Sequence, residues 1–183
     1  ADHNLAIGIN ALGVNTTGAS NLAIGNYALD ANTTASYNTA IGYTALSANT
    51  TGTNNTAIGH TALASNTTGT ANVAVGLQAL NQNTGSSNVA VGQNALYLNT
   101  SASNNTAVGH SSLGANTTGQ YNVAIGSLAL DANTTADSNV AVGYNALTKN
   151  TTGGANLAIG RNALQETTTG SDNIGIGLQA LQN

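Results

Sequence analysis

Residues 38–54 read Asn-Thr-Ala-Ile-Gly-Tyr-Thr-Ala-Leu-Ser-Ala-Asn-Thr-Thr-Gly-Thr-Asn, and the rest of the chain repeats this phrase with small variations. The consensus is Asn-x-Ala-(Ile/Val)-Gly-x-x-Ala-Leu-x-x-Asn-Thr-Thr-Gly-x-x. Its eleven copies begin at Asn4, Asn21, Asn38, Asn55, Asn72, Asn88, Asn105, Asn122, Asn139, Asn156 and Asn173. A helix pair or a propeller blade needs roughly 33 to 50 residues, so a period of seventeen is too short for either. It fits one rung of a β-solenoid.

The repeat predicts an all-β fold, a parallel β-solenoid or β-roll of about eleven rungs, with residues 1–183 as a single repeat domain. In such an array each rung contacts only its neighbours. The chain has no Pro, so every backbone N–H is available for hydrogen bonds between rungs. A helical fold is disfavoured because each rung carries Gly and most carry an Asn-Thr-Thr segment. The rung that begins at Asn72 is one residue short.

Two apolar columns are the candidate core, counting each leading Asn as position 1 of its rung. Position 4 is always Ile or Val and position 9 is always Leu, and burial of each side chain contributes roughly 1.5–3 kcal/mol. The predicted core columns include Ile7, Ile24, Ile41, Ile58, Val75, Val91, Leu12, Leu29, Leu46 and Leu63. Ala at positions 3 and 8 is a poor strand former. Its recurrence indicates a rung with little room between its two sides.

Asn recurs at positions 1 and 12, where stacked side chains are expected to form amide ladders along the rod. The position 1 ladder is expected to include Asn4, Asn21, Asn38, Asn55 and Asn72. At position 12 the Asn-Thr-Thr and Asn-Thr-Ser segments also match the N-glycosylation sequon. The candidate acceptors are Asn15, Asn32, Asn49, Asn66, Asn99, Asn116, Asn133 and Asn150. A repeated turn produces the same pattern, so both readings stay open.

The register of the rungs predicts specific side-chain contacts between consecutive rungs. Lys149 and Glu166 both occupy position 11 of consecutive rungs, so they should face each other about 5 Å apart. Tyr144 and Arg161 share position 6 of the same rungs and could form a cation–π pair. A large separation between Lys149 and Glu166 would show that the alignment of the repeats is wrong.

The composition excludes several classes of function. Charged residues make up 4% of the chain and only two are basic, which argues against nucleic acid as a partner. No apolar stretch approaches the roughly 18 residues of a membrane span, so membrane insertion is not expected. The absence of Cys removes disulfides and thiolate metal sites.

Catalytic chemistry is not expected either. Asp30 and Asp131 share position 10 but lie six rungs apart, roughly 29 Å. His60 and His110 share position 6 at about 14 Å, too far apart to bind one metal within a chain. The sequence therefore predicts no catalytic residue, no metal site and no cofactor, and a protein that is not an enzyme.

The phrase Asn-x-Ala-(Ile/Val)-Gly-x-x-Ala-Leu resembles the head repeats of YadA-like trimeric autotransporter adhesins and similar repeats in phage tail-fibre and surface-fibre proteins. The resemblance covers nearly the whole chain and implies a left-handed parallel β-roll, often trimeric, that presents an adhesive surface. The rungs of such heads are usually shorter, nearer fourteen residues. Here the Asn-Thr-Thr-Gly turn is longer.

The resulting expectation is a non-enzymatic structural or adhesive subunit of an extracellular or cell-surface fibre. Its first partner would be itself, as a homotrimer or as a head-to-tail filament, joined through uncapped solenoid ends or through lateral faces. A host surface, a cell surface or matrix is the candidate external partner. The alternative is an ice-binding solenoid that uses the Thr and Asn columns of the turn.

Overall fold

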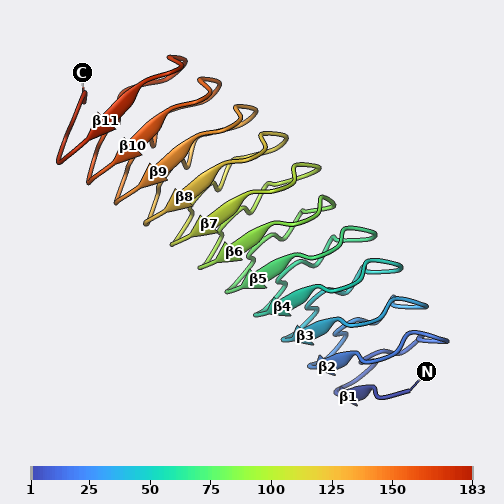
Figure 1. Ribbon diagram of the computed structural model, residues 1–183. Helices are drawn as coiled ribbons and strands as arrows, with labels where there is room; N and C mark the ends of the chain where they lie inside the picture. The colour runs from blue at the N-terminus through green and yellow to red at the C-terminus, as the bar shows by residue number, and fades with distance from the viewer. Residues whose placement is uncertain (1, 183) are drawn as a thin grey trace.

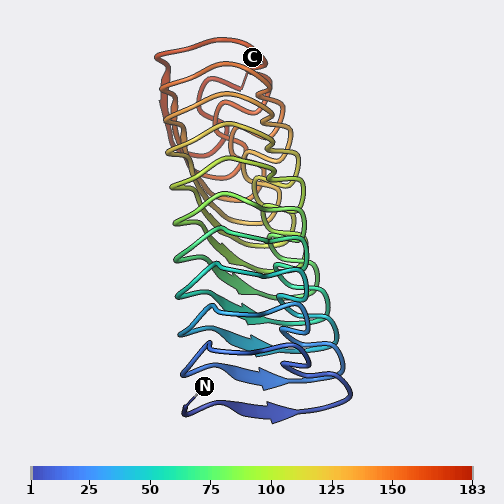
Figure 2. The same ribbon diagram turned by 90° about the vertical axis from the view of Figure 1, so that its right-hand side faces the viewer.

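The computed structural model describes residues 2–182 and is a rod of stacked rungs with the two ends of the chain at opposite ends (Figures 1 and 2). Each rung contributes one three-residue strand. The strands are β1 Leu5–Ile7, β2 Leu22–Ile24, β3 Thr39–Ile41, β4 Thr56–Ile58, β5 Val73–Val75, β6 Val89–Val91, β7 Thr106–Val108, β8 Val123–Ile125, β9 Val140–Val142, β10 Leu157–Ile159 and β11 Ile174–Ile176. No helix occurs among the described residues.

The strands form one parallel sheet in chain order, which confirms the predicted β-solenoid. Equivalent residues lie directly over one another; Ala40, for example, pairs with Ala57. The register is kept across the short fifth rung, where Ala74 pairs with Ala90. The missing residue is therefore absorbed outside the sheet.

The interior of the rod is built from small side chains and one column of Leu. Position 3 is completely buried at Ala23, Ala40, Ala57, Ala74, Ala90, Ala107, Ala124, Ala141 and Ala158. The Leu of position 9 is buried at Leu29, Leu46, Leu63, Leu80, Leu96, Leu113, Leu130, Leu147 and Leu164, and Leu12 is partly buried against the same core. Where Gly175 replaces Ala at position 3, an added Cβ would lie 2.9 Å from Leu164 Cγ. The two sides of a rung thus lie too close together for a larger residue at position 3.

The expectation that position 4 belongs to the core was wrong. Successive side chains of a strand point to opposite faces, so burial of Ala at position 3 turns positions 2 and 4 outward. Val91 keeps 37% of its surface exposed, while the neighbouring Ala90 has none. The residues that lie outside the core, against expectation, are Ile7, Ile24, Ile41, Ile58, Val75 and Val91.

Gly at position 5 ends each strand for two independent reasons. Gly109 has φ of +135°, a conformation that residues with a side chain rarely adopt. A Cβ on Gly109 would also lie 2.5 Å from the carbonyl oxygen of Gly126 on the next rung. Both the local conformation and the close stacking therefore require Gly at this position.

Three further positions of each rung have positive φ although they are not Gly. These are positions 7, 9 and 17, represented in the second rung by Tyr27, Leu29 and Tyr37. Leu29 adopts φ of 52°, which is unfavourable for an L-residue outside a tight turn. Its N–H donates to the carbonyl of Ala45 at 3.1 Å. The same hydrogen bond, together with burial or partial burial of the Leu side chain, holds this conformation in rungs one to ten.

Candidate functional site: the outer sheet face

Positions 2 and 4 of all rungs form a continuous surface along the rod, here called the outer sheet face. It consists of Leu5, Ile7, Leu22, Ile24, Thr39, Ile41, Thr56, Ile58, Val73, Val75, Val89, Val91, Thr106, Val108, Val123, Ile125, Val140, Val142, Leu157, Ile159, Ile174 and Ile176. Every one of these side chains is exposed or half-buried. Because the backbone of each strand is paired to its neighbours, the face is rigid and its two columns repeat at the spacing of the rungs.

The outer sheet face carries no charge and only three hydroxyls, those of Thr39, Thr56 and Thr106. The other side chains are aliphatic. Most monomeric proteins expose no apolar patch larger than roughly 300–600 Å², whereas the nineteen aliphatic side chains of this face at roughly 50 Å² each give roughly 1,000 Å². The face is therefore large enough to require a functional explanation.

Aromatic side chains border the face at position 6 and the neighbouring position 7. Tyr43 stacks on His60 with ring centroids 5.5 Å apart, and Tyr27 meets Tyr43 edge-on at 6.0 Å. Farther along, the Arg161 guanidinium lies 5.9 Å from the centre of the Tyr144 ring, as the register predicted. These contacts join consecutive rungs, so they strengthen the stack at the edge of the outer sheet face.

The turn side of each rung, which comprises positions 12 to 17 and the position 1 Asn that follows them, is held by buried Asn residues. At position 1, Asn21 accepts a hydrogen bond from the backbone N–H of Asn38 at 3.0 Å and donates to the carbonyl of Ala35 at 2.9 Å. At position 12, Asn116 donates to Asn99 Oδ1 at 2.8 Å and to the carbonyl of Gly119 at 2.9 Å. Position 12 is thus a side-chain ladder, whereas position 1 bonds chiefly to the backbone.

This arrangement is incompatible with the reading of the turns as glycan acceptors. A glycan is attached to Nδ2 of Asn, and in this fold that nitrogen points inward and donates to the carbonyl at position 15. The buried candidates are Asn32, Asn49, Asn66, Asn99, Asn116, Asn133 and Asn150, while Asn15 is half-buried with the same bond to Gly18. The Asn-Thr-Thr motif is therefore explained by the turn itself.

The structure also places the Thr and Asn columns that the ice-binding alternative would use. The Asn columns are buried. The position 13 hydroxyls of Thr16, Thr50 and Thr117 each donate to the Thr carbonyl of the next rung, at 2.9 to 3.1 Å. These hydroxyls are used to stack the rungs.

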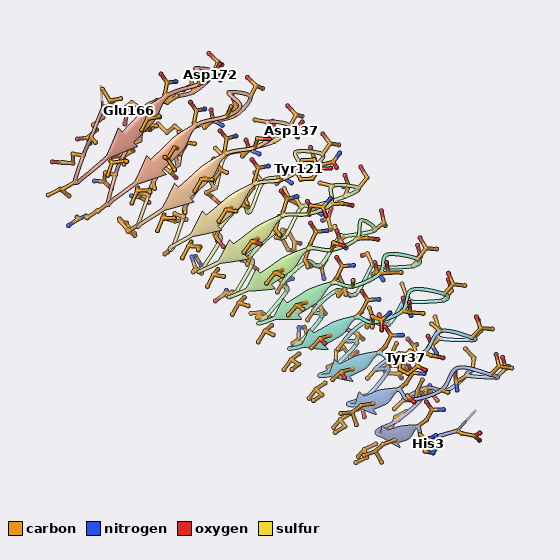
Figure 3. All side chains as sticks on the ribbon, viewed as in Figure 1. His3, Tyr37, Tyr121, Asp137, Glu166 and Asp172 are labelled. Atoms are coloured by element: carbon orange, nitrogen blue, oxygen red, sulfur yellow. The ribbon has the colours of Figure 1, made fainter. Side chains whose placement is uncertain are left out.

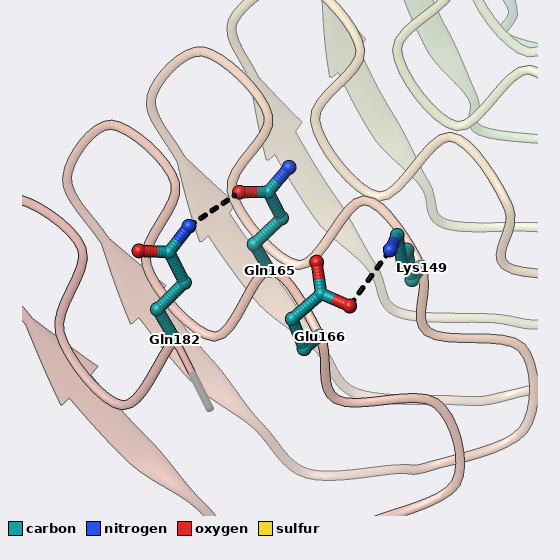
Figure 4. Close-up of polar contacts among 4 residues, drawn as sticks. All are labelled: Lys149, Gln165, Glu166 and Gln182. Atoms are coloured by element: carbon teal, nitrogen blue, oxygen red, sulfur yellow. Dashed lines mark hydrogen bonds and ion pairs between the residues drawn. The ribbon is translucent and has the colours of Figure 1, made fainter.

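The ionisable groups do not converge. Lys149 Nζ lies 2.7 Å from Glu166 Oε2, which confirms the predicted register (Figure 4). Figure 3 shows Tyr37, Tyr121, Asp137 and Asp172 spread along the rod. Within residues 2–182, no three His, Asp or Glu side chains come together as metal ligands, and no pocket is formed. The same residues include no helix long and apolar enough to cross a membrane.

The Asp131 carboxyl lies in a partly buried environment. Partial burial raises the pKa of its carboxyl above the ordinary 3.8, and the charge of His110 and the Gly114 backbone N–H lower it in part. Asp131 occupies position 10, directly over Gly114 of the preceding rung. A single carboxyl without a converging partner supplies no catalytic pair.

Sequence reasoning assigned position 4 of the outer sheet face to the core because it treated the largest apolar side chains as interior. The signal that could have revealed the face was present: position 3 is Ala in every rung but the last, while position 2 alternates among Leu, Val, Thr and Ile. A thin interior accepts only a small residue, so position 3 is nearly constant, whereas a surface position such as position 2 can vary. No protein-family model, curated protein or solved structure matches the chain.

Proposed function

We propose that the chain is a non-enzymatic module of an extracellular or cell-surface fibre, and that copies of it associate side by side through the outer sheet face. The observation that carries the proposal is the rigid, uncharged and mostly aliphatic double column of side chains that runs along all eleven strands. The resemblance to fibre and adhesin repeats agrees with it, but it depends on the repeat motif alone.

The size of the face supports a stable contact. Specific protein interfaces bury roughly 800 Å² on each partner, and the outer sheet face offers roughly 1,000 Å² of mostly apolar area. Homodimer interfaces are more apolar than other protein surfaces and contain few charges at their centre. No charged residue has to be desolvated when this face is covered.

The spacing of the face favours a second copy as the partner. Its side chains form ridges that repeat once per rung, at about 4.8 Å. Such ridges interdigitate along their whole length only with an array of the same spacing. Another copy of the outer sheet face has that spacing by construction, whereas a globular partner could match only a few rungs.

The proposal is tested by comparing the mass in solution of three proteins across a range of concentrations. One is the natural chain, one carries Val91→Lys and Ile125→Lys on the outer sheet face, and the control carries Thr51→Lys and Thr118→Lys on the exposed turn side. All four sites face solvent, so the β circular dichroism of the single chain should be unchanged. We expect the natural and control proteins to associate, and the face variant to weaken association by about thirty-fold or more.

Two results would contradict this function. If the natural chain stays monomeric up to millimolar concentration, the outer sheet face does not mediate self-association. If the monomer shows thermal hysteresis, and the Val91→Lys and Ile125→Lys variant loses it, the function of the outer sheet face is ice binding.

A further inference from the structure

The short fifth rung leaves a gap in the position 12 ladder. Rungs two to four and six to nine each donate from the position 12 Asn Nδ2 to the Asn Oδ1 of the rung before; Asn66, for example, donates to Asn49 at 3.1 Å. Asn83 of the fifth rung donates instead to the carbonyl of Gly85 within its own turn, at 2.9 Å. Asn66 Oδ1 is therefore buried without a hydrogen-bond partner. It is the one position 12 oxygen in this state among the described residues.

The neighbouring Thr contacts are missing at the same place. At the junction before it, the Thr50 N–H donates to the carbonyl of Thr67 at 2.9 Å and the Thr50 hydroxyl does the same at 3.1 Å. Neither Thr67 nor Thr68 makes a cross-rung bond of this kind to the fifth rung, within the part of the chain that the structure describes. The junction between rungs two and three also lacks the Thr bonds, but it keeps its Asn bond, from Asn49 to Asn32 at 3.1 Å.

The sheet side of the same junction is intact. Thr56 donates from its N–H to the carbonyl of Asn72 at 2.8 Å, and the Gly76 N–H donates to the carbonyl of Ile58 at 2.8 Å. The strands β4 and β5 keep their full register. The deletion thus weakens one side of the stack and leaves the other side fastened.

We infer that the junction between rungs four and five is a hinge of the rod, which opens on the turn side while β4 and β5 stay paired. A buried oxygen without a partner favours the open state, in which water can satisfy it. Opening of one side around a paired sheet bends the rod instead of breaking it. This inference concerns the single chain and is independent of the proposed self-association.

Amide hydrogen exchange tests the hinge at the two hydrogen bonds that flank the gap. These are Ser65 N–H to the carbonyl of Asn81 and Ser87 N–H to the carbonyl of Thr70, 3.0 and 2.9 Å long. The matched references at the previous junction are Ala48 N–H to Ala64 and Ala71 N–H to Thr53, both 3.1 Å long. After correction for intrinsic rates, Ser65 and Ser87 should exchange about tenfold faster than Ala48 and Ala71. Equal rates in the natural chain would overturn the inference.

Two variants, one with a longer fifth rung and one with a shorter seventh rung, test the hinge in both directions. Insertion of one Thr after Thr84 restores the seventeen-residue rung and should slow Ser65 and Ser87 to the rate of the references. Deletion of Thr118 from the seventh rung should accelerate Leu98, whose N–H donates to the carbonyl of Gly114 at 3.1 Å. The Gly76 amide on the sheet side should change in neither variant. If the insertion leaves Ser65 and Ser87 fast, the hinge is wrong; if a variant fails to fold, the comparison within the natural chain still decides.

Discussion

The sheet side and the turn side of each rung keep the same register by different means. On the sheet side, backbone bonds such as Gly76 N–H to the Ile58 carbonyl hold the stack, and the outward side chains take no part in it. On the turn side, the polar side chains themselves make the bonds, as Asn116 does with Asn99. The sheet side therefore has a surface free for a partner, while the turn side is sensitive to the loss of a single residue.

The largest effect is expected from a change that blocks the approach of the sheet-side backbones. Gly109→Ala would place a Cβ 2.5 Å from the Gly126 carbonyl oxygen in a conformation, φ of +135°, that Ala rarely adopts. We expect a loss of about 3 kcal/mol or more in the free energy of unfolding, measured by urea denaturation.

Gly154→Ala is the matched control for that change. Gly154 does not have positive φ, and an added Cβ would lie 3.2 Å from its nearest neighbour, the Asp137 carbonyl oxygen. Position 16 already holds Ala19 in the first rung. This variant should lose less than about 1 kcal/mol. Equal losses in the two variants would mean that the close approach at position 5 does not control the stacking.

A smaller effect is expected when the ladder of the turn side is cut. Asn116→Ala removes the donor to Asn99 and to the Gly119 carbonyl, and it also removes the acceptor for Asn133 Nδ2. A group left buried without a partner costs about 1–3 kcal/mol, and here Asn99 Oδ1 loses its partner, so we expect a loss of about 2 kcal/mol in urea denaturation.

Asn66→Ala sharpens this measurement because Asn66 Oδ1 accepts no hydrogen bond. The substitution removes the same two donor contacts, to Asn49 and Gly69, but no acceptor contact. It should cost about 1 kcal/mol less than Asn116→Ala. A loss as large as that of Asn116→Ala would contradict the gap at the fifth rung.

The same difference between the two sides explains how far the sequence could predict the structure. Periodicity sets the register, because all rungs but the fifth have the same length and equivalent residues must stack. Lys149 and Glu166 therefore meet as predicted. Periodicity says nothing about which column faces inward. That choice depends on the thickness of the rung, which admits Ala but not Ile, and hydrophobicity alone ranks these residues in the opposite order.

The turn was harder to interpret from the sequence for another reason. Asn, Thr and Gly are the usual residues of exposed turns and of glycosylation sequons, and both readings place them in water. In this rod the turn is folded against its neighbours, and the carbonyl of Gly52 accepts from both Asn38 and Asn49 at 2.9 and 3.0 Å. Only the stacked structure shows that these amides are interior.

The smallest effect is expected at Asp131, at position 10 of its rung, and it depends on pH. Because burial raises the pKa of the Asp131 carboxyl above 3.8, the folded chain binds this proton more tightly than the unfolded chain does. The contribution of Asp131 to stability is therefore fully present below pH 3.8 and is lost as the pH rises through the raised pKa of the folded state.

Asp131→Asn keeps an acceptor oxygen for the Gly114 N–H and does not ionise. The variant should be more stable than the natural chain at pH 7, and this advantage should disappear at pH 3. Thermal unfolding at the two pH values measures it, and an advantage of the same size at both would show that ionisation of Asp131 does not oppose folding.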